Sequence, residues 1–249
     1  PMSHALYWAM QPVEFAARKL VGVNIEETLL QRHQILDHRL DHLIRDNGVT
    51  QVLEIACGLS PRGMQFSRRY PQVKYVEADL PGMVERKRTL LNRNAALRDK
   101  HTIVECNFFE KDTPAALNTV LREHFDQSQP IAIITEGLVN YFDLPTISSV
   151  WGKIARLTRA FPAAWYLTDL YPEAHGRAAP FVNIGARLLG QITRAEVNLH
   201  FTSDDAIEEG FRQVGFSEVT AHQPEQFYDI VPIPRSTSHS HVRVVEARV

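Results

Sequence analysis

Short apolar strands alternate with helix-like stretches between residues 51 and 170, and this alternation constrains the fold more than any other feature of the chain. The predicted strands are rich in Val, Ile, Tyr and Phe and cover residues 52–55, 73–79, 101–107, 130–136 and 163–170. The helices expected beside them cover residues 62–69, 83–97, 113–125 and 146–161. Strands that alternate with helices usually form a parallel sheet with right-handed crossovers. The pattern therefore predicts an α/β fold with a doubly wound, Rossmann-like sheet.

The pattern differs at both ends of the chain. Two helices are expected before the first strand, over residues 4–21 and 25–47, and Gly48 stands where the second one should stop. After residue 171 we expect an apolar helical insertion, a helix over residues 202–215, and strands over residues 218–222 and 241–249. The last two strands are expected to pair antiparallel, because the connection with Pro232 and Pro234 shows no helical pattern. The predicted sheet thus has seven strands and is mostly parallel, with an antiparallel last strand.

No repeat or linker interrupts the sequence, so we predict a single domain over residues 1–249. Its parts are an N-terminal helical lid or brace (2–48), a ligand-binding core (49–171), a helical insertion that serves as a lid (172–201) and a C-terminal helix with strands (202–249). Pro1 precedes Met2, and we expect the natural chain to begin at Met2.

Composition indicates a small-molecule partner. The 249 residues are 44% apolar and 22% charged, and the formal net charge is −2 with both signs mixed along the chain. Such a balance favours neither nucleic acid nor a membrane surface as partner. No apolar run approaches the roughly 20 residues of a membrane span, and the amino end lacks the order of a signal peptide, so a cytoplasmic location is expected.

Three histidines lie on the second expected helix, at positions 33, 38 and 42. Their spacing does not bring all three to one face within reach of one ion, and a zinc site needs three or four converging ligands. We therefore expect solvated or capping histidines and no metal site. Cys57 and Cys106 follow apolar strands and are expected to be buried free thiols.

The turn after the first strand reads G-L-S-P-R-G over residues 58–63 and resembles the dinucleotide fingerprint G-x-G-x-x-G only in part. Gly58 and Gly63 match its first and third glycines, but Ser60 replaces the middle one, where a side chain obstructs a pyrophosphate. The turn fits neither a nucleophile elbow nor a phosphate-binding P-loop. The sequence therefore disfavours a nicotinamide cofactor and indicates a nucleoside ligand without a diphosphate.

An acid at the end of the second strand supports the nucleoside. Asp79 follows Gly58 by 21 positions, and an acidic residue about 20 positions after the first glycine binds ribose hydroxyls in α/β nucleotide sites. Glu77 is the other candidate, since alternation places it on the same face of the strand.

Four blocks of sequence resemble the class I S-adenosylmethionine-dependent methyltransferases. They read L-L-Q-R-H-Q-I-L-D-H-R-L, V-L-E-I-A-C-G-L-S-P-R, Y-V-E-A-D-L-P and I-T-E-G-L-V-N-Y-F, in family order between residues 29 and 142. The closer likeness is to the leucine carboxyl methyltransferase family, which includes bacterial O-methyltransferases of polyketide and other secondary metabolism. The final third resembles this family only in its helix ending G-F-R-Q-V-G-F.

The resemblance implies S-adenosyl-L-methionine as cofactor and assigns residues to its parts. Arg32 would pair with the carboxylate and Glu136 with the amino group. Glu54 and Gly58 would line the methionine and ribose side, Asp79 would take the ribose hydroxyls, and Asn107 with Phe108 would meet the adenine. The family usually carries an acid where Asn107 stands, and an amide is a weaker acceptor. Arg62 is interpreted as a brace of the turn and is left out of the chemistry.

The resemblance also implies an O-methyltransferase, whose acceptor is open between a carboxylate and a hydroxyl. A carboxylate is ionised at neutral pH and needs no general base, whereas a hydroxyl must lose its proton during attack. Tyr141 follows the fourth strand and is implied to orient the acceptor, although a packed aromatic ring is an equal alternative. A protein that binds the cofactor without transferring methyl remains possible, because fold and cofactor site do not fix the reaction.

Overall fold

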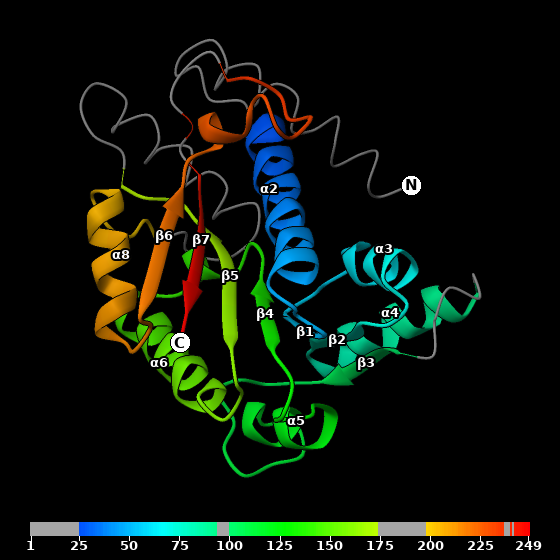
Figure 1. Cartoon of the computed structure of the whole chain (residues 1–249). Helices are drawn as coiled ribbons and strands as arrows, with labels where there is room; N and C mark the ends of the chain where they lie inside the picture. Colours follow the sequence, from blue (N-terminus) through cyan, green and yellow to red (C-terminus); the bar gives the residue numbers. More distant parts are fainter. Residues whose placement is uncertain (1–24, 94–99, 174–197, 237–239, 241) are drawn as a thin grey trace.

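A computed structural model describes residues 25–93, 100–173, 198–236, 240 and 242–249. Its helices and strands follow one another in the order drawn in Figure 1: α2 (Ile25–Asp46), β1 (Gln51–Ile55), α3 (Arg62–Arg69), β2 (Lys74–Asp79), α4 (Pro81–Arg93), β3 (His101–Glu105), α5 (Leu117–His124), β4 (Ile131–Thr135), η1 (Val139–Tyr141), α6 (Leu144–Thr158), β5 (Ala164–Leu170), α8 (Asp204–Gln213), β6 (Glu218–His222), η3 (Pro224–Phe227) and β7 (Arg243–Arg248). The helix predicted over residues 4–21 and nearly all of the insertion predicted after residue 171 lie outside the described residues.

The strands form one seven-stranded sheet in the order β3-β2-β1-β4-β5-β7-β6. Strands β1 to β5 pair in parallel, and β7 runs antiparallel to both of its neighbours, β5 and β6. The predicted α/β fold, with a mostly parallel sheet and an antiparallel last strand, is confirmed.

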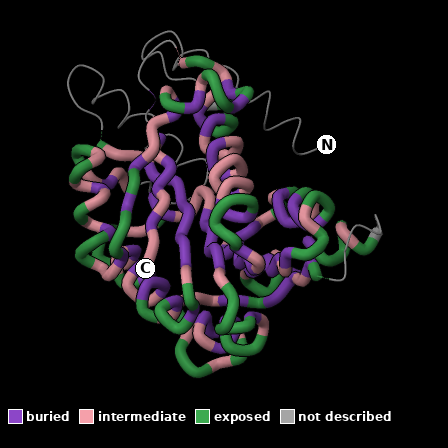
Figure 2. The backbone as a smooth tube through the Cα atoms, in the orientation of Figure 1, coloured by how far each residue is buried: buried purple, intermediate pink, exposed green. Residues whose placement is uncertain are grey.

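The helices cover both faces of this sheet, and the strands between them are the most buried part of the chain (Figure 2). Helices α2 and α3 pack on the face formed by residues such as Val52, Tyr75 and Leu167, and α4 joins them through a contact with Glu77. Helices α5, α6 and α8 cover the opposite face, against residues such as Leu53 and Val245. Because the alternation of side chains along each strand supplies both faces, the sheet is apolar on two sides and needs two helical layers.

Helix α2 packs against the sheet along the face that its sequence predicted. Leu36, Leu40 and Leu43 are fully buried, whereas Leu29, expected on the same face, is 42% exposed near the start of the helix. Gly48 has a φ of +72°, which glycine adopts without strain, and the chain leaves the helix there as expected.

The predicted start of the helix before β4 is wrong. We expected it at residue 113, but α5 begins at Leu117 because residues 107–116 form a hydrogen-bonded loop. The hydroxyl of Thr113 donates to Glu110, and the backbone N–H of Ala116 donates to the carbonyl of Thr113.

Two smaller expectations concern the cysteines and the membrane. Cys57 and Cys106 are buried and free, as predicted. Among the described helices, none is both long enough and apolar enough to cross a membrane.

Candidate functional site

The site predicted from the sequence lies where the carboxyl ends of β1, β2, β3 and β4 meet at one edge of the sheet. The strand order reverses there, since β2 lies on one side of β1 and β4 on the other. Open α/β sheets bind ligands in the crevice at such a switch point. All the predicted site residues except Arg32 and Glu54 lie on the segments that follow these strands or at a strand's last residue.

The turn after β1 is tied to the end of β2 by Asp79. The backbone N–H of Gly58 donates to Asp79 Oδ2 at 2.7 Å, and the N–H of Leu80 donates to Oδ1 at 2.7 Å. Gly58 has a φ of +51°, which suits glycine in this sharp turn. Each carboxylate oxygen has two lone pairs, so Asp79 retains acceptor capacity for the hydroxyls of a ligand.

Glu77, the alternative to Asp79, is committed to buried protein groups. Its two oxygens contact Lys87 Nζ at 2.6 Å and His101 Nε2 at 2.8 Å, and its side chain is fully buried. A Cβ placed on Gly63 would lie 2.4 Å from Glu77 Cδ, so only glycine lets α3 approach β2 this closely. The geometry therefore favours Asp79 over Glu77 as the ribose contact.

A charged cluster lies between α2, α3 and the carboxyl ends of β1, β4 and β5. We call it the Arg62 network and define it by Arg32, His33, Asp37, Glu54, Arg62, Glu136 and Asp169. Its centre is the Arg62 guanidinium, which is completely buried and contacts Asp37 Oδ1 at 2.5 Å, Glu54 Oε1 at 2.8 Å and Glu136 Oε2 at 2.5 Å. Arg62 thus connects α3 with α2, with β1 and with the segment after β4, and it holds Glu136 in place.

Arg32 lies beside this centre and faces the turn after β4. Its Nε is 3.2 Å from Glu136 Oε1, and its Nη1 is 3.1 Å from Asp169 Oδ2. A Cβ on Gly137 would lie 3.0 Å from Arg32 Nη2, and Gly137 has a φ of +65°. The N–H of Gly137 donates to Asp169 Oδ1 at 2.6 Å, so Asp169 aligns both the turn and the guanidinium.

The network keeps Glu136 ionised. Burial alone opposes the charge, but His33, Arg62 and Arg32 outweigh it and lower the pKa of Glu136 from 4.5 to about 2. The carboxylates around Arg62 raise the pKa of its guanidinium against the opposing effect of burial, so it stays protonated. Glu136 is therefore a carboxylate held between cations at neutral pH.

Glu54 lies beneath Arg62 and is almost fully buried. Its second oxygen accepts a hydrogen bond from the Tyr75 hydroxyl at 2.7 Å. Because Arg62 and Tyr75 occupy both oxygens, the contacts of this side chain are with the protein, and its predicted role at the cofactor would act through Arg62.

The expectation that His33 is solvated or a helix cap is wrong. Its Nδ1 is 2.9 Å from Glu136 Oε2 and 3.0 Å from Arg62 Nη2, and its Nε2 is 3.6 Å from Asp37 Oδ2. The reason is the tertiary packing of α2, which turns one side of the helix toward the end of β4. No group of three or more His, Cys, Asp or Glu side chains in the described part of the chain has the arrangement of a metal site.

The loop after β3 carries the residues predicted to meet the adenine. Asn107 Oδ1 accepts from the N–H of Phe109 at 3.1 Å, and Asn107 Nδ2 donates to Glu110 at 3.1 Å, so one lone pair and one hydrogen of the amide remain. Phe108 packs against Phe109, with ring centroids 4.6 Å apart. Lys153 on α6 donates to the carbonyls of residues 108 and 110 and fixes this loop to the helix.

Tyr141 ends the short helix η1 and is 45% exposed. Its neighbour Asn140 is buried and bonds the carbonyls of Tyr171 and Asn198 and the N–H of Tyr171. The imidazole of His200 contacts the Phe142 carbonyl at 2.9 Å. These contacts fix the backbone around Tyr141 while its ring stays accessible.

Comparison with known proteins identifies the family. The model of the leucine carboxyl methyltransferase family matches residues 6–155, which is more than half of the chain. The chain belongs to the leucine carboxyl methyltransferase family. This finding confirms the resemblance seen in the sequence and S-adenosyl-L-methionine as the cofactor.

Curated relatives of the chain come from mycobacteria. A protein of Mycobacterium tuberculosis named "Putative S-adenosyl-L-methionine-dependent methyltransferase" is 26% identical over 191 residues, which cover 72% of this chain and 59% of the relative. A protein of Mycolicibacterium smegmatis with a similar name is 37% identical over 98 residues, 39% of this chain and 32% of its own. The chain thus spans little more than half the length of the first of these relatives.

Solved structures share the fold at low sequence identity. A "putative methyltransferase" from Thermobifida fusca superposes with a TM-score of 0.62 and 16% identity, over 94% of this chain and 85% of that one. The magnesium protoporphyrin IX methyltransferase of Synechocystis, solved with bound S-adenosylhomocysteine, gives a TM-score of 0.53 and 14% identity, over 91% of this chain and 88% of that one. These likenesses show the fold of a class I methyltransferase.

His33, Asp37 and Asp169 were not predicted from the sequence as members of the site. One signal was present for α2, because His33 and Asp37 stand four residues apart and therefore share one face of the helix, and His33 follows Arg32 directly in the sequence. Asp169 stands near the carboxyl end of β5, where ligand-binding residues of α/β sheets gather, and could have been found by that rule.

Proposed function

We propose that the chain is an S-adenosylmethionine-dependent O-methyltransferase that acts on a small molecule of secondary metabolism, with a carboxylate preferred over a hydroxyl as acceptor. The observation that carries the proposal is the opposite charge of Arg32 and Glu136 at the switch point of the sheet. These two side chains lie 3.2 Å apart and suit the carboxylate and ammonium of an amino acid, the end by which the cofactor differs from other nucleosides.

The charge of the Arg62 network also suits this ligand. Within the described residues the network contains four carboxylates and two guanidiniums, so acidic groups outnumber permanently basic ones. A cofactor with an ammonium and a sulfonium carries one more positive than negative charge. Arg32 and Glu136 would hold its amino-acid end, and Asp79 would hold its ribose.

The bound cofactor supplies a methyl group on a positive sulfur, from which an acceptor oxygen displaces the neutral thioether. The task of the protein is then to hold donor and acceptor in line and to exclude water. A carboxylate acceptor arrives ionised and needs no base. His200 supports this preference through its geometry, because its Nε2 lies 2.9 Å from the Phe142 carbonyl and so holds its hydrogen there, which leaves that nitrogen unable to accept a proton from an acceptor hydroxyl. The exposed Tyr141 hydroxyl would orient the acceptor.

The ribose contact provides the sharpest test. We expect Asp79→Ala to weaken S-adenosylhomocysteine binding about 100-fold or more in calorimetry, because two hydrogen bonds to a charged acceptor are each worth about 1.5–3 kcal/mol. The matched control is Asp126→Ala, since Asp126 also accepts a backbone N–H but precedes β4 at the other edge of the sheet. Unchanged affinity in Asp79→Ala would refute the ribose assignment.

Methyl transfer is tested separately from binding. Purified chain and S-adenosylmethionine are incubated with a panel of aromatic and aliphatic carboxylic acids and their hydroxyl analogues, and S-adenosylhomocysteine is measured. Methyl esters as products would support the proposal, and methyl ethers would move the acceptor preference to hydroxyls. Tight binding without product across the panel would favour the alternative of a cofactor-binding protein that transfers no methyl.

A further inference from the structure

Among the residues that the structure describes, Glu136 has three basic partners, and one of them can lose its charge near neutral pH. Arg32 and Arg62 contact it at 3.2 Å and 2.5 Å, and a guanidinium stays protonated in proteins. The third partner is His33, whose Nδ1 lies 2.9 Å from Glu136 Oε2. Imidazole has a reference pKa of about 6.5 and is therefore the titratable part of this arrangement.

The hydrogen-bond partner of His33 Nδ1 depends on whether that nitrogen carries a proton. With a proton on Nδ1, it donates to Glu136. Without that proton, Nδ1 becomes an acceptor and lies 3.0 Å from Arg62 Nη2, a donor. The remaining proton then sits on Nε2, which faces Asp37 at 3.6 Å. Both states use the same atomic positions and require no movement of the ring.

We infer that His33 is a positioning residue that stands in for the cofactor's ammonium at Glu136 and releases a proton to solvent when that ammonium binds. The inference rests on the proposed function, because it takes Glu136 as the partner of the amino group. In the ligand-free chain, His33 donates one hydrogen bond to Glu136. When the cofactor binds, its ammonium donates that bond, Nδ1 loses its proton, and the vacated nitrogen accepts from Arg62.

The charges around His33 set the direction of the effect. Asp37 on α2, Glu136 after β4, and Arg62 on α3 face the ring, with Arg32 on the far side of Glu136. The hydrogen bond to Glu136 raises the pKa of His33 above its ordinary value in the free chain, although burial and Arg62 oppose it. A bound ammonium removes that bond and adds a positive charge, which lowers the pKa. Affinity therefore rises with pH until His33 is deprotonated in the free chain.

The experiment is calorimetric titration of the whole chain with S-adenosylhomocysteine at about pH 6.5 in two buffers of different ionisation enthalpy. This pH lies below the reference pKa of an α-amino group, about 7.7–8.0, so the ligand keeps its own proton. We expect the wild type to release a large fraction of one proton, and its affinity to rise with pH, by at most about tenfold per pH unit, over the range in which His33 of the free chain loses its proton. In His33→Asn, whose amide can still donate to Glu136, both effects should be lost.

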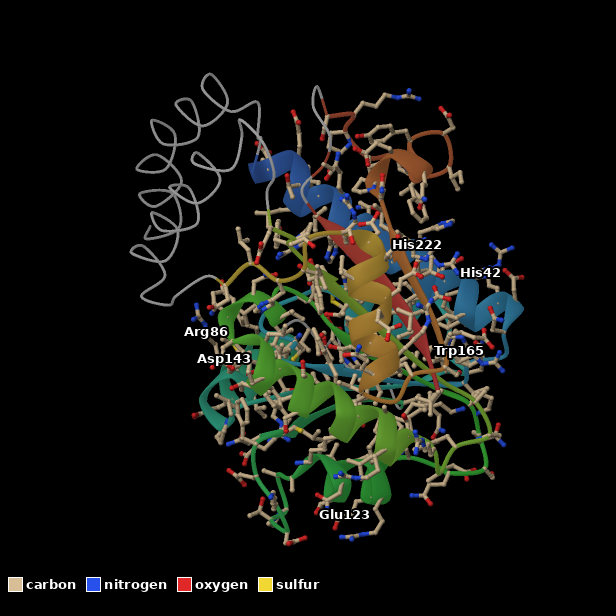
Figure 3. The ribbon with its side chains drawn as sticks, turned by 90° about the vertical axis from the view of Figure 1, so that its left-hand side faces the viewer. His42, Arg86, Glu123, Asp143, Trp165 and His222 are labelled. Carbon is tan, nitrogen blue, oxygen red and sulfur yellow. The ribbon has the colours of Figure 1, made fainter. Side chains whose placement is uncertain are left out.

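The matched control is His42→Asn. His42 lies on the same helix, as Figure 3 shows, and also pairs with a carboxylate, Asp46 at 2.7 Å, but it is 41% exposed and lies outside the Arg62 network. Its proton release should equal that of the wild type.

Two results would overturn the inference and leave the proposed function standing. One is a wild type that binds the ligand without releasing protons, which decides the matter even if His33→Asn does not fold. The other is equal proton release by His33→Asn and the wild type. Absence of any binding by the folded wild type across the pH range would instead refute the proposed function and this inference together.

Discussion

Replacement of Glu136 by Gln is expected to remove about 3 kcal/mol of stability from the ligand-free chain at neutral pH. The side chain is only 15% exposed, so solvent screens its ion pairs weakly. Its pKa falls from 4.5 in the unfolded chain to about 2 in the folded one, and each pKa unit corresponds to about 1.36 kcal/mol. Gln keeps the size of the side chain and one acceptor oxygen, so the loss reports mainly on the charge.

The same substitution should change how stability depends on pH. A carboxyl whose pKa is lower in the folded state contributes its stability above the unfolded pKa and loses it as pH falls through the folded pKa. For Glu136 this window runs from about pH 5 down to about pH 2. The wild type should therefore lose more stability in acid than Glu136→Gln, and the difference between them should shrink as pH falls.

Urea unfolding at about pH 7, 5, 4 and 3, followed by tryptophan fluorescence, measures this difference, because Trp151 and Trp165 are buried. The control is Glu246→Gln, since Glu246 is similarly exposed at 17% and, among the described residues, is held by one guanidinium, that of Arg39, with His222 Nε2 farther away at 4.0 Å. Its loss at neutral pH should be smaller. If the free energy of unfolding fell equally with pH in the wild type and in Glu136→Gln, the Glu136 charge would not stabilise the folded chain as we expect.

Two further predictions test the packing of the turn and the role of the exposed ring. Gly63→Ala should cost about 1–3 kcal/mol in urea unfolding, because its Cβ would overlap Glu77, whereas Gly82→Ala, with no atom within 4 Å of the added Cβ, should cost nothing. Equal stability of the two variants would show that the Glu77 side chain shifts at little cost to make room for the added methyl group. Tyr141→Phe should lower turnover about tenfold, the value of one hydrogen bond, and leave cofactor affinity in calorimetry unchanged. If Tyr141→Phe weakened cofactor affinity and left turnover unchanged, Tyr141 would not belong to the acceptor site.

The fold was predictable because its determinants are local. Each strand is a short apolar run with its own turn residues, and the strand predicted over residues 218–222 matches β6 at both ends. The start of α5 was missed for a different reason. Thr113 resembles a helix start in sequence, but its hydroxyl bonds Glu110 and extends the loop that began at Asn107. Side-chain hydrogen bonds of this kind compete with the helix and are not visible in a hydrophobic pattern.

The candidate site was predictable only in part. Asp79 was indicated by its spacing from Gly58, whereas Glu136 was indicated only by the family resemblance. Arg62 contacts Asp37, which lies 25 positions earlier in the sequence, and Glu136, which lies 74 positions later. No local sequence pattern predicts pairs at such separations. The sequence suggested that Arg62 braces the turn after β1. Its partners on α2, on β1 and after β4 depend on the tertiary packing of α2 against the sheet, which the sequence pattern does not give.

Under the proposed function, the Arg62 network connects the stability of the chain to ligand binding. Arg62 is completely buried and cannot touch a ligand while it holds Glu54, Asp37 and Glu136, so its effect on binding must pass through the position of Glu136. A buried guanidinium among several carboxylates is stable only if their charges are balanced, and removal of one partner from such a group costs about 3–5 kcal/mol. The ligand-free chain has fewer guanidiniums than carboxylates in this network, and a proton on His33 or a bound ammonium supplies the next positive charge. Neutralising Glu136 is therefore expected to lower the stability of the folded chain and, under the proposed function, also its attraction for a cationic cofactor. Glu136 thus contributes to the stability of the fold through its ion pairs, and the same carboxylate is the group that we propose attracts the ammonium of the cofactor.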